Sequence, residues 1–125
     1  MEFVSFDLAK KLKEKGFNLD EPYSMYNEKG VLHKLYTSAG FDNVYDFDER
    51  DYISPTISQV LKWLRDNHKL HISTKPYPCE DGLMWLYEVR KFSSVLVCVV
   101  VNKTGFQKPE QAAIAGIEYV LDNLI

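Results

Sequence analysis

The clearest periodicity in the chain lies in residues 54–72, where apolar side chains recur at the spacing of an amphipathic helix. Four of them share one stripe: Ile57, Val60, Leu61 and Leu64. Thr56 and Gln59 are spaced as a capping box, which satisfies backbone N–H groups at a helix start. We therefore expect a helix of about three turns. Leu70 and Ile72 then alternate with polar residues, which predicts a half-buried strand directly after the helix.

The first third of the chain predicts a short helix and a hairpin. Ser5 is a good N-cap and Gly16 a typical helix stop, so residues 6–15 are expected to be helical. Residues 23–26 and 31–36 have strand character and flank the polar turn at residues 27–30, which ends in a glycine. This order predicts an antiparallel hairpin.

The last third predicts further strands and a final helix. Residues 83–90 and 95–102 are apolar runs joined by four residues, and we expect them to pair as antiparallel strands. The second run is apolar on both faces, which indicates a central strand covered on both sides. Residues 75–82 hold two prolines, which cannot donate to a ladder, so a turn that breaks the sheet edge is expected there. Pro109 should begin the last helix, where Gly116 indicates a close approach to the sheet.

Composition adds a fold class to this pattern. A chain of 125 residues with 46% hydrophobic content fits a single α+β domain. We expect a helix, hairpin and acidic segment in residues 1–53, and a helix–strand–strand–strand–helix core in residues 54–125, with the antiparallel sheet packed on one face by the two later helices. Two cysteines make no disulfide framework, and neither a signal peptide nor an apolar run of about 18 residues occurs, so a reduced, cytoplasmic protein is expected.

The charge distribution argues against nucleic acid as the favoured partner. Residues 1–54 hold 7 Lys and Arg against 11 Asp and Glu, a balance of −4, and residues 55–125 hold 8 against 7, a balance of +1. Neither part has the basic excess that phosphate binding normally requires.

Residues 37–53 form the most acidic segment and show no clear period. A calcium loop would need a glycine at its sharp turn and a spaced glutamate, both of which are missing, so a solvated loop anchored by aromatic residues is the better interpretation. Connections of this length inside compact domains are often functional. Five of its residues are therefore our candidate partner contacts: Tyr45, Asp46, Asp48, Asp51 and Tyr52.

No catalytic or cofactor-binding motif occurs in the sequence: there is no nucleophile elbow, phosphate-binding glycine loop, HExxH or CxxC. The histidines, His33, His68 and His71, are scattered, and with Cys79 they would make a poor zinc site. Trp85 and Tyr87 share one strand face, and we favour burial in the core over a stacking platform for bases or sugars. We therefore expect no enzyme activity, no metal and no cofactor.

Three stretches carry a resemblance to a known family: PTISQVLKWLRDNHKLHI, LMWLYEV and EQAAIAGIEYVLDNLI. In these the chain resembles a family of small proteins without an established activity, found in genomes of gut Bacteroidetes and their phages and mobile elements. The likeness covers most of residues 55–125, with a weaker echo in the N-terminal helix and hairpin. It implies a cytoplasmic accessory protein of phage or mobile-element origin, and it carries over no functional residue.

The order helix, three strands, helix over residues 56–125 is also similar to the double-stranded RNA-binding domain. That resemblance implies binding through the first helix, the loop between the first two strands and a lysine cluster at the start of the last helix. Here the loop at residues 76–82 is acidic and lacks the expected histidine, and the lysine cluster is missing. The contacts expected with duplex RNA are Lys62, Arg65, Lys103 and Lys108.

Together these patterns favour a non-enzymatic interaction protein that binds a host or phage protein, with the acidic segment as its contact. A degenerate double-stranded RNA-binding module is the alternative. An enzyme whose site follows no recognised sequence pattern is a third possibility.

Overall fold

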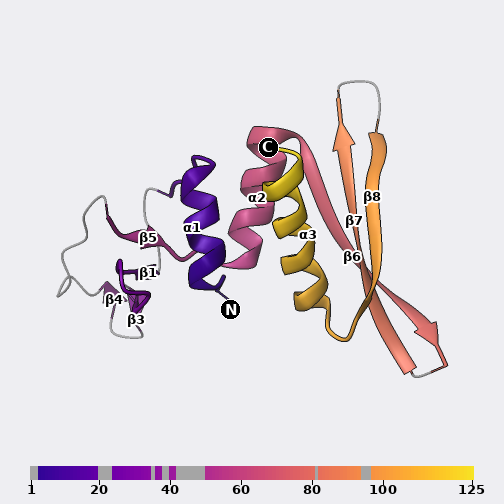
Figure 1. The fold of residues 1–125 in the computed structure, drawn as a ribbon, viewed down its shortest axis with the longest axis horizontal. Helices are drawn as coiled ribbons and strands as arrows, with labels where there is room; N and C mark the ends of the chain where they lie inside the picture. Colours follow the sequence, from indigo (N-terminus) through magenta and orange to yellow (C-terminus); the bar gives the residue numbers. More distant parts are fainter. Residues whose placement is uncertain are drawn as a thin grey trace. The chain divides into compact units, whose positions relative to one another are not determined.

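The computed structural model describes residues 3–19, 24–34, 36–37, 40–41, 50–80, 82–93 and 97–125. These residues form three helices, two antiparallel three-stranded sheets and a two-stranded ladder, which is the predicted α+β class (Figure 1). The chain divides into two compact units, an N-terminal unit Met1–Ile57 and a C-terminal unit Ser58–Ile125. The expectation of one domain with two parts, residues 1–53 and 54–125, stays a prediction. Within the described parts, no helix has the length and apolar content needed to cross a membrane.

In the N-terminal unit, helix α1 (Phe6–Glu14) begins and ends close to where its caps predict. The Ser5 side chain accepts a hydrogen bond from the Leu8 N–H at 3.3 Å. Gly16 has a φ of 87°, which turns the chain back so that the Phe17 N–H donates to the Leu12 carbonyl at 3.0 Å. Phe17 is thereby buried against the apolar side of α1, together with Leu8, Ala9 and Leu12.

The predicted hairpin is confirmed where the structure describes it. Strands β1 (Ser24–Tyr26) and β2 (Leu32–Lys34) pair antiparallel around a turn in which Asn27 Oδ1 accepts hydrogen bonds from two backbone N–H groups. A third strand, β5 (Tyr52–Ile53), pairs with the other edge of β1, so the hairpin belongs to a small sheet of its own, in the order β2-β1-β5.

The expectation that residues 37–53 lack regular structure was wrong at three places. Short strands β3 (Tyr36–Thr37) and β4 (Gly40–Phe41) pair with each other, and β5 joins β1. Strands of two residues are too short to show an alternating pattern. β3 and β4 pair locally with each other, whereas β5 pairs with β1, which is distant in the sequence.

The C-terminal unit follows the predicted order: α2 (Ile57–His68), β6 (Leu70–Cys79), β7 (Gly82–Phe92), β8 (Val97–Phe106) and α3 (Pro109–Asn123). The three strands are antiparallel in the order β6-β7-β8. Helix α3 packs along one face of this sheet, and Figure 1 shows α2 on the same side.

Gly116 explains how closely α3 approaches the sheet. A Cβ atom at this position would lie 2.9 Å from Ile72 Cγ2 and 3.2 Å from the Tyr87 ring, so only glycine fits without a shift of its neighbours. Ile72, Tyr87 and Val89 are buried beneath the helix face. The close approach predicted for Gly116 and the core position predicted for Tyr87 are both confirmed, while Trp85 is half-buried.

The predicted turn at residues 75–82 was wrong, because β6 continues through both prolines to Cys79. β6 is an edge strand, and Pro76 and Pro78 lie on alternate residues opposite Trp85 and Leu83. The Phe92 N–H donates to the Lys69 carbonyl, so residues 69 and 92 form a hydrogen-bonded pair. Bonded and non-bonded pairs alternate along an antiparallel ladder, so the β6 residues whose N–H groups point toward β7 have odd numbers. Both prolines therefore occupy positions whose N–H would point away from β7, where a strand tolerates them.

The prediction that residues 95–102 form the central strand was also wrong. The central strand is β7, and β8 is the second edge. Val99 and Val100 are 56% and 40% exposed, so this part of β8 is not covered on both faces. An apolar run signals burial only as a tendency, and an edge strand that carries an interaction surface has the same composition.

Candidate functional site

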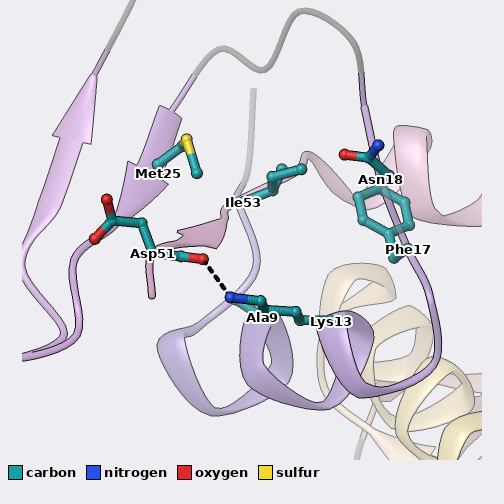
Figure 2. A pocket seen from close by; sticks show the side chains of 7 residues that line it. All are labelled: Ala9, Lys13, Phe17, Asn18, Met25, Asp51 and Ile53. Atoms are coloured by element: carbon teal, nitrogen blue, oxygen red, sulfur yellow. Dashed lines mark hydrogen bonds between the residues drawn. The ribbon is translucent and has the colours of Figure 1, made fainter. Parts of the chain in front are cut away.

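A pocket of about 250 Å³ lies in the N-terminal unit between α1, the segment that follows it, and strands β1 and β5 (Figure 2). Its lining consists of Ala9, Lys13, Phe17, Asn18, Met25, Asp51 and Ile53. Met25 and Ile53 are direct partners in the β1–β5 ladder, so their side chains lie on the same face of the small sheet. The register of two strands therefore fixes the apolar wall of the pocket.

Lys13 ties α1 to the segment that enters β5. Its Nζ donates a hydrogen bond to the Asp51 backbone carbonyl at 3.0 Å and lies 4.8 Å from the centroid of the Tyr52 ring. Figure 2 shows the Asp51 carboxylate on the far side of its backbone from the Lys13 amine. One lysine thus positions two of the five predicted partner contacts, through the backbone of Asp51 and the ring of Tyr52.

Two of the five predicted partner contacts lie within the described residues and three lie outside them. Asp51 is only 8% exposed, and Tyr52 is half-buried in β5. Tyr45, Asp46 and Asp48 lie outside the described residues, so their role stays a prediction. A residue as buried as Asp51 offers little area to a partner.

An aromatic cluster supports this part of the unit. The Phe6 ring centroid lies 5.4 Å from that of Tyr26 and 5.5 Å from that of Tyr52. The Lys10 ammonium lies 4.6 Å from the centroid of the Phe6 ring. Lys10 and Lys13 of α1 therefore both lie over aromatic rings. The spacing of Phe6 and Lys10, four residues apart, was a signal for one of these contacts.

The second candidate site is the sheet face of the C-terminal unit that does not contact α3. Alternate residues of a strand point to opposite faces, and Ile72 and Tyr87 mark the face beneath α3. The register then assigns the other face, which we call the open face: His71, Ser73, Lys75 and Tyr77 of β6, Met84, Leu86, Glu88 and Arg90 of β7, and Val99, Asn102 and Thr104 of β8. Both helices of the unit lie on the other side of the sheet (Figure 1).

Glu88 lies at the centre of the open face. It is 8% exposed and forms ion pairs with Arg90 and with Lys75, whose Nζ lies 3.6 Å from Glu88 Oε2. The hydrogen bond from Arg90 lowers the pKa of Glu88 below its ordinary value, against the smaller opposing effect of burial. The Glu88 carboxylate therefore stays charged at neutral pH and holds two basic side chains in place.

A bulge in β8 lies directly after Val99 of the open face. Arg90 pairs with Val99 and Val89 with Val101, which leaves Val100 without a partner of its own in β7. Bulges re-aim side chains at sheet edges. Here the bulge coincides with Val99 and Val100, which are both exposed.

The residues expected to contact RNA lie on three elements. Lys62 and Arg65 belong to α2, Lys103 is exposed on β8, and Lys108 is the N-cap residue of α3. Lys62 forms an ion pair with Asp66 four residues later on the same helix. This pairing reduces the charge that Lys62 offers to a phosphate.

Among the described residues, no three His, Cys, Asp or Glu side chains come together in a way that could hold a metal ion. Cys79 is exposed, and its thiol donates to the Gly82 carbonyl at 3.1 Å. In comparisons with known proteins, no family model, curated sequence or solved structure matches the chain.

Proposed function

We propose that this protein is a non-enzymatic interaction protein that binds a partner protein on the open face of its C-terminal sheet. The observation that carries the proposal is the 56% exposure of Val99, the register partner of Arg90, beside the ion-paired centre formed by Glu88. An apolar area next to fixed charges is typical of a protein contact surface, where the apolar part supplies affinity and the charges set orientation.

The charges of the open face indicate the chemistry of the partner. Lys75 and Arg90 contribute +2 and Glu88 contributes −1, so the centre of the face carries +1, although the whole chain carries −3. A partner that presents an apolar patch bordered by an acidic residue complements this arrangement. The cytoplasmic location and the phage or mobile-element origin belong to the same proposal. The location is expected from the cysteine content and the family resemblance, and the origin from the resemblance alone.

The test uses the full chain, tagged, as bait in a lysate of the organism that encodes it, with nuclease present. Val99→Glu introduces a negative charge where an acidic partner would dock, and Val31→Glu makes the same change at a 51% exposed valine of the N-terminal unit. We expect Val99→Glu to abolish capture of the partner and Val31→Glu to preserve it. The purified partner should then bind wild type directly, with a Kd raised at least tenfold by Val99→Glu.

Equal capture by both variants would refute the open face as the binding surface. A further bait, Asp46→Ala with Asp48→Ala, tests the acidic segment separately and leaves the buried Asp51 intact. If this bait loses the partner while Val99→Glu keeps it, the contact lies in the acidic segment and not on the sheet.

Duplex RNA is the second candidate ligand, favoured by one observation: α2, the antiparallel sheet and α3 follow the order expected of a double-stranded RNA-binding domain. Fold order alone is weak support for function. Fluorescence anisotropy with a labelled RNA duplex tests this candidate. Phosphate contacts by Arg65, Lys103 and Lys108 would give an affinity that falls steeply as the salt concentration rises. No binding at low salt would end this candidate.

A further inference from the structure

The pocket of the N-terminal unit has features that the proposed protein contact does not use. It is bounded by α1, the segment after it, β1 and β5, and these walls are joined by specific bonds. The Ser54 N–H donates to the Ser24 carbonyl at 3.0 Å, and the Ser24 hydroxyl donates to the Ser54 carbonyl at 3.0 Å. Together with the bond between Lys13 and Asp51, they fix the positions of these walls relative to one another.

The lining of the pocket separates an apolar wall from a cation. Ala9, Phe17, Met25 and Ile53 supply the apolar wall, and Figure 2 shows Met25 and Ile53 on one side with Phe17 and Asn18 across from them. The positive charge comes from Lys13, whose Nζ is held at the Asp51 carbonyl. The Asp51 carboxylate, which would oppose an anion, points away from that amine (Figure 2).

We infer that this pocket binds a small organic anion, with its apolar body against Met25 and Ile53 and its carboxylate beside the Lys13 ammonium. The volume of the pocket limits the size of the ligand that it can hold. A cavity of roughly 150 Å³ holds benzene, so the 250 Å³ of this pocket corresponds by proportion to about ten non-hydrogen atoms. A medium-chain monocarboxylate such as octanoate has this size and polarity.

The probe is octanoate, titrated into the full chain, with octanol as the neutral ligand of the same chain length. Binding is followed by NMR through the methyl signals of Met25 and Ile53, the two side chains of the apolar wall. We expect saturable shifts with octanoate and an affinity for octanol that is lower by about tenfold or more, because octanol lacks the charge that Lys13 attracts. Absence of saturable shifts with octanoate, or equal affinity for the two ligands, would overturn the inference.

Variants test the role of Lys13 directly. Lys13→Met removes the charge and keeps most of the apolar stem, Lys13→Arg keeps the charge, and Lys15→Met removes a charge from an exposed residue outside the pocket lining. Octanoate binding should weaken about tenfold or more in Lys13→Met and should persist in Lys13→Arg and Lys15→Met. Ile53→Trp, which fills the pocket, should abolish binding of both ligands. Retention of octanoate binding in Lys13→Met or in Ile53→Trp would place the ligand elsewhere.

Discussion

Gly116 leaves no room for a side chain between α3 and the sheet. Ile72 and Tyr87, the two side chains that a Cβ would meet, are 5% and 2% exposed, so neither has room to move toward solvent. Because interiors are close-packed, a clash of this kind shifts the whole helix rather than one atom.

We predict that Gly116→Ala destabilises the protein even though alanine favours helices. The gain in helix propensity is about 1 kcal/mol. Overpacking a core typically costs about 1–3 kcal/mol, so a net loss of about 1 kcal/mol in the free energy of unfolding is expected. Urea unfolding followed by circular dichroism measures it, with Gln111→Ala, an exposed change on the same helix, as the control. A variant more stable than wild type would show that α3 is not pressed against the sheet.

Glu88 makes part of the stability depend on pH. Its pKa is lowered from the ordinary 4.5, first by the hydrogen bond from Arg90 and also by the charges of Arg90 and Lys75. A carboxyl group with a lowered pKa in the folded state stabilises the fold above its unfolded pKa, and this contribution disappears as the pH falls through the folded value.

Glu88→Gln should therefore lower Tm at about pH 7 and should have progressively less effect below pH 4.5. Thermal unfolding across this range measures the difference between variant and wild type. Glu118→Gln, at an exposed position of α3, is the matched control and should leave Tm nearly unchanged throughout. A Tm difference for Glu88→Gln that does not change with pH would refute the role of the ion pairs.

Local chemistry made several residues predictable, whereas contacts between distant residues were not. The cap at Ser5 and the stop at Gly16 follow from rules that operate within a few residues. The close approach at Gly116 was predictable because a glycine inside a helix is itself a local signal, although the residues it approaches are distant in the sequence. The bond from Lys13 to Asp51 joins positions 38 residues apart, and no pattern in the sequence indicates it. The pocket was missed for the same reason.

At the scale of elements, the two edges of the C-terminal sheet are protected in different ways. On β6, Pro76 and Pro78 remove N–H groups that would otherwise face outward. On β8, two irregularities in the register interrupt the ladder, one at Val100 and one at Gly105, whose φ is 104°. Both devices make it harder for another strand to add to the sheet.

Replacing both prolines, Pro76→Thr and Pro78→Thr, should leave the fold intact and promote association. Each threonine restores an outward N–H, so the mean mass in solution should rise with concentration more steeply than for wild type. Size-exclusion chromatography with light scattering measures this. Pro109→Thr, at the first turn of α3 and away from the edge, is the control. Identical mass profiles for the double variant and wild type would show that the prolines do not protect this edge.

The elements also show where sequence patterns fail. Helix periods, the Ser5 cap and the proline at the start of α3 located α1, α2 and α3 well, because a helix is stabilised by its own neighbours in sequence. Strand order was mistaken for β8 and strand length for β6, because both depend on which neighbour a strand pairs with. A proline or an apolar run therefore indicates different structures in an edge strand and in a central strand of a sheet.

At the scale of the whole molecule, the two units differ in how much backbone pairing holds them. In the C-terminal unit, β6 and β7 pair from Leu70 to Cys79, and β7 is also paired along its other side with β8. In the described part of the N-terminal unit, β1 pairs with β2 at three positions and with β5 at two. Local opening requires less free energy where fewer pairs must break.

Hydrogen exchange should therefore be at least tenfold slower for central β7 amides than for those of β1 and β5. Tyr87 and Val89, buried beneath α3, are expected among the most protected. Mass spectrometry of peptic fragments measures the rates, and α1, whose amides are bonded within one helix, serves as the internal reference for the N-terminal unit. Equal protection of β1 and β7 would mean that the two units open together.

The bulge at Val100 bears on how this chain tolerates changes in length. Losing one residue from a strand normally reverses the faces of every residue beyond the gap. Loss of Val100 would not reverse these faces, because Val99 and Val101 already pair with Arg90 and Val89, which are adjacent in β7. Deletion of Val100 would leave a continuous ladder with all other pairs in place. In evolutionary terms this position is a place where a gene can gain or lose a single codon while the open face keeps its pattern.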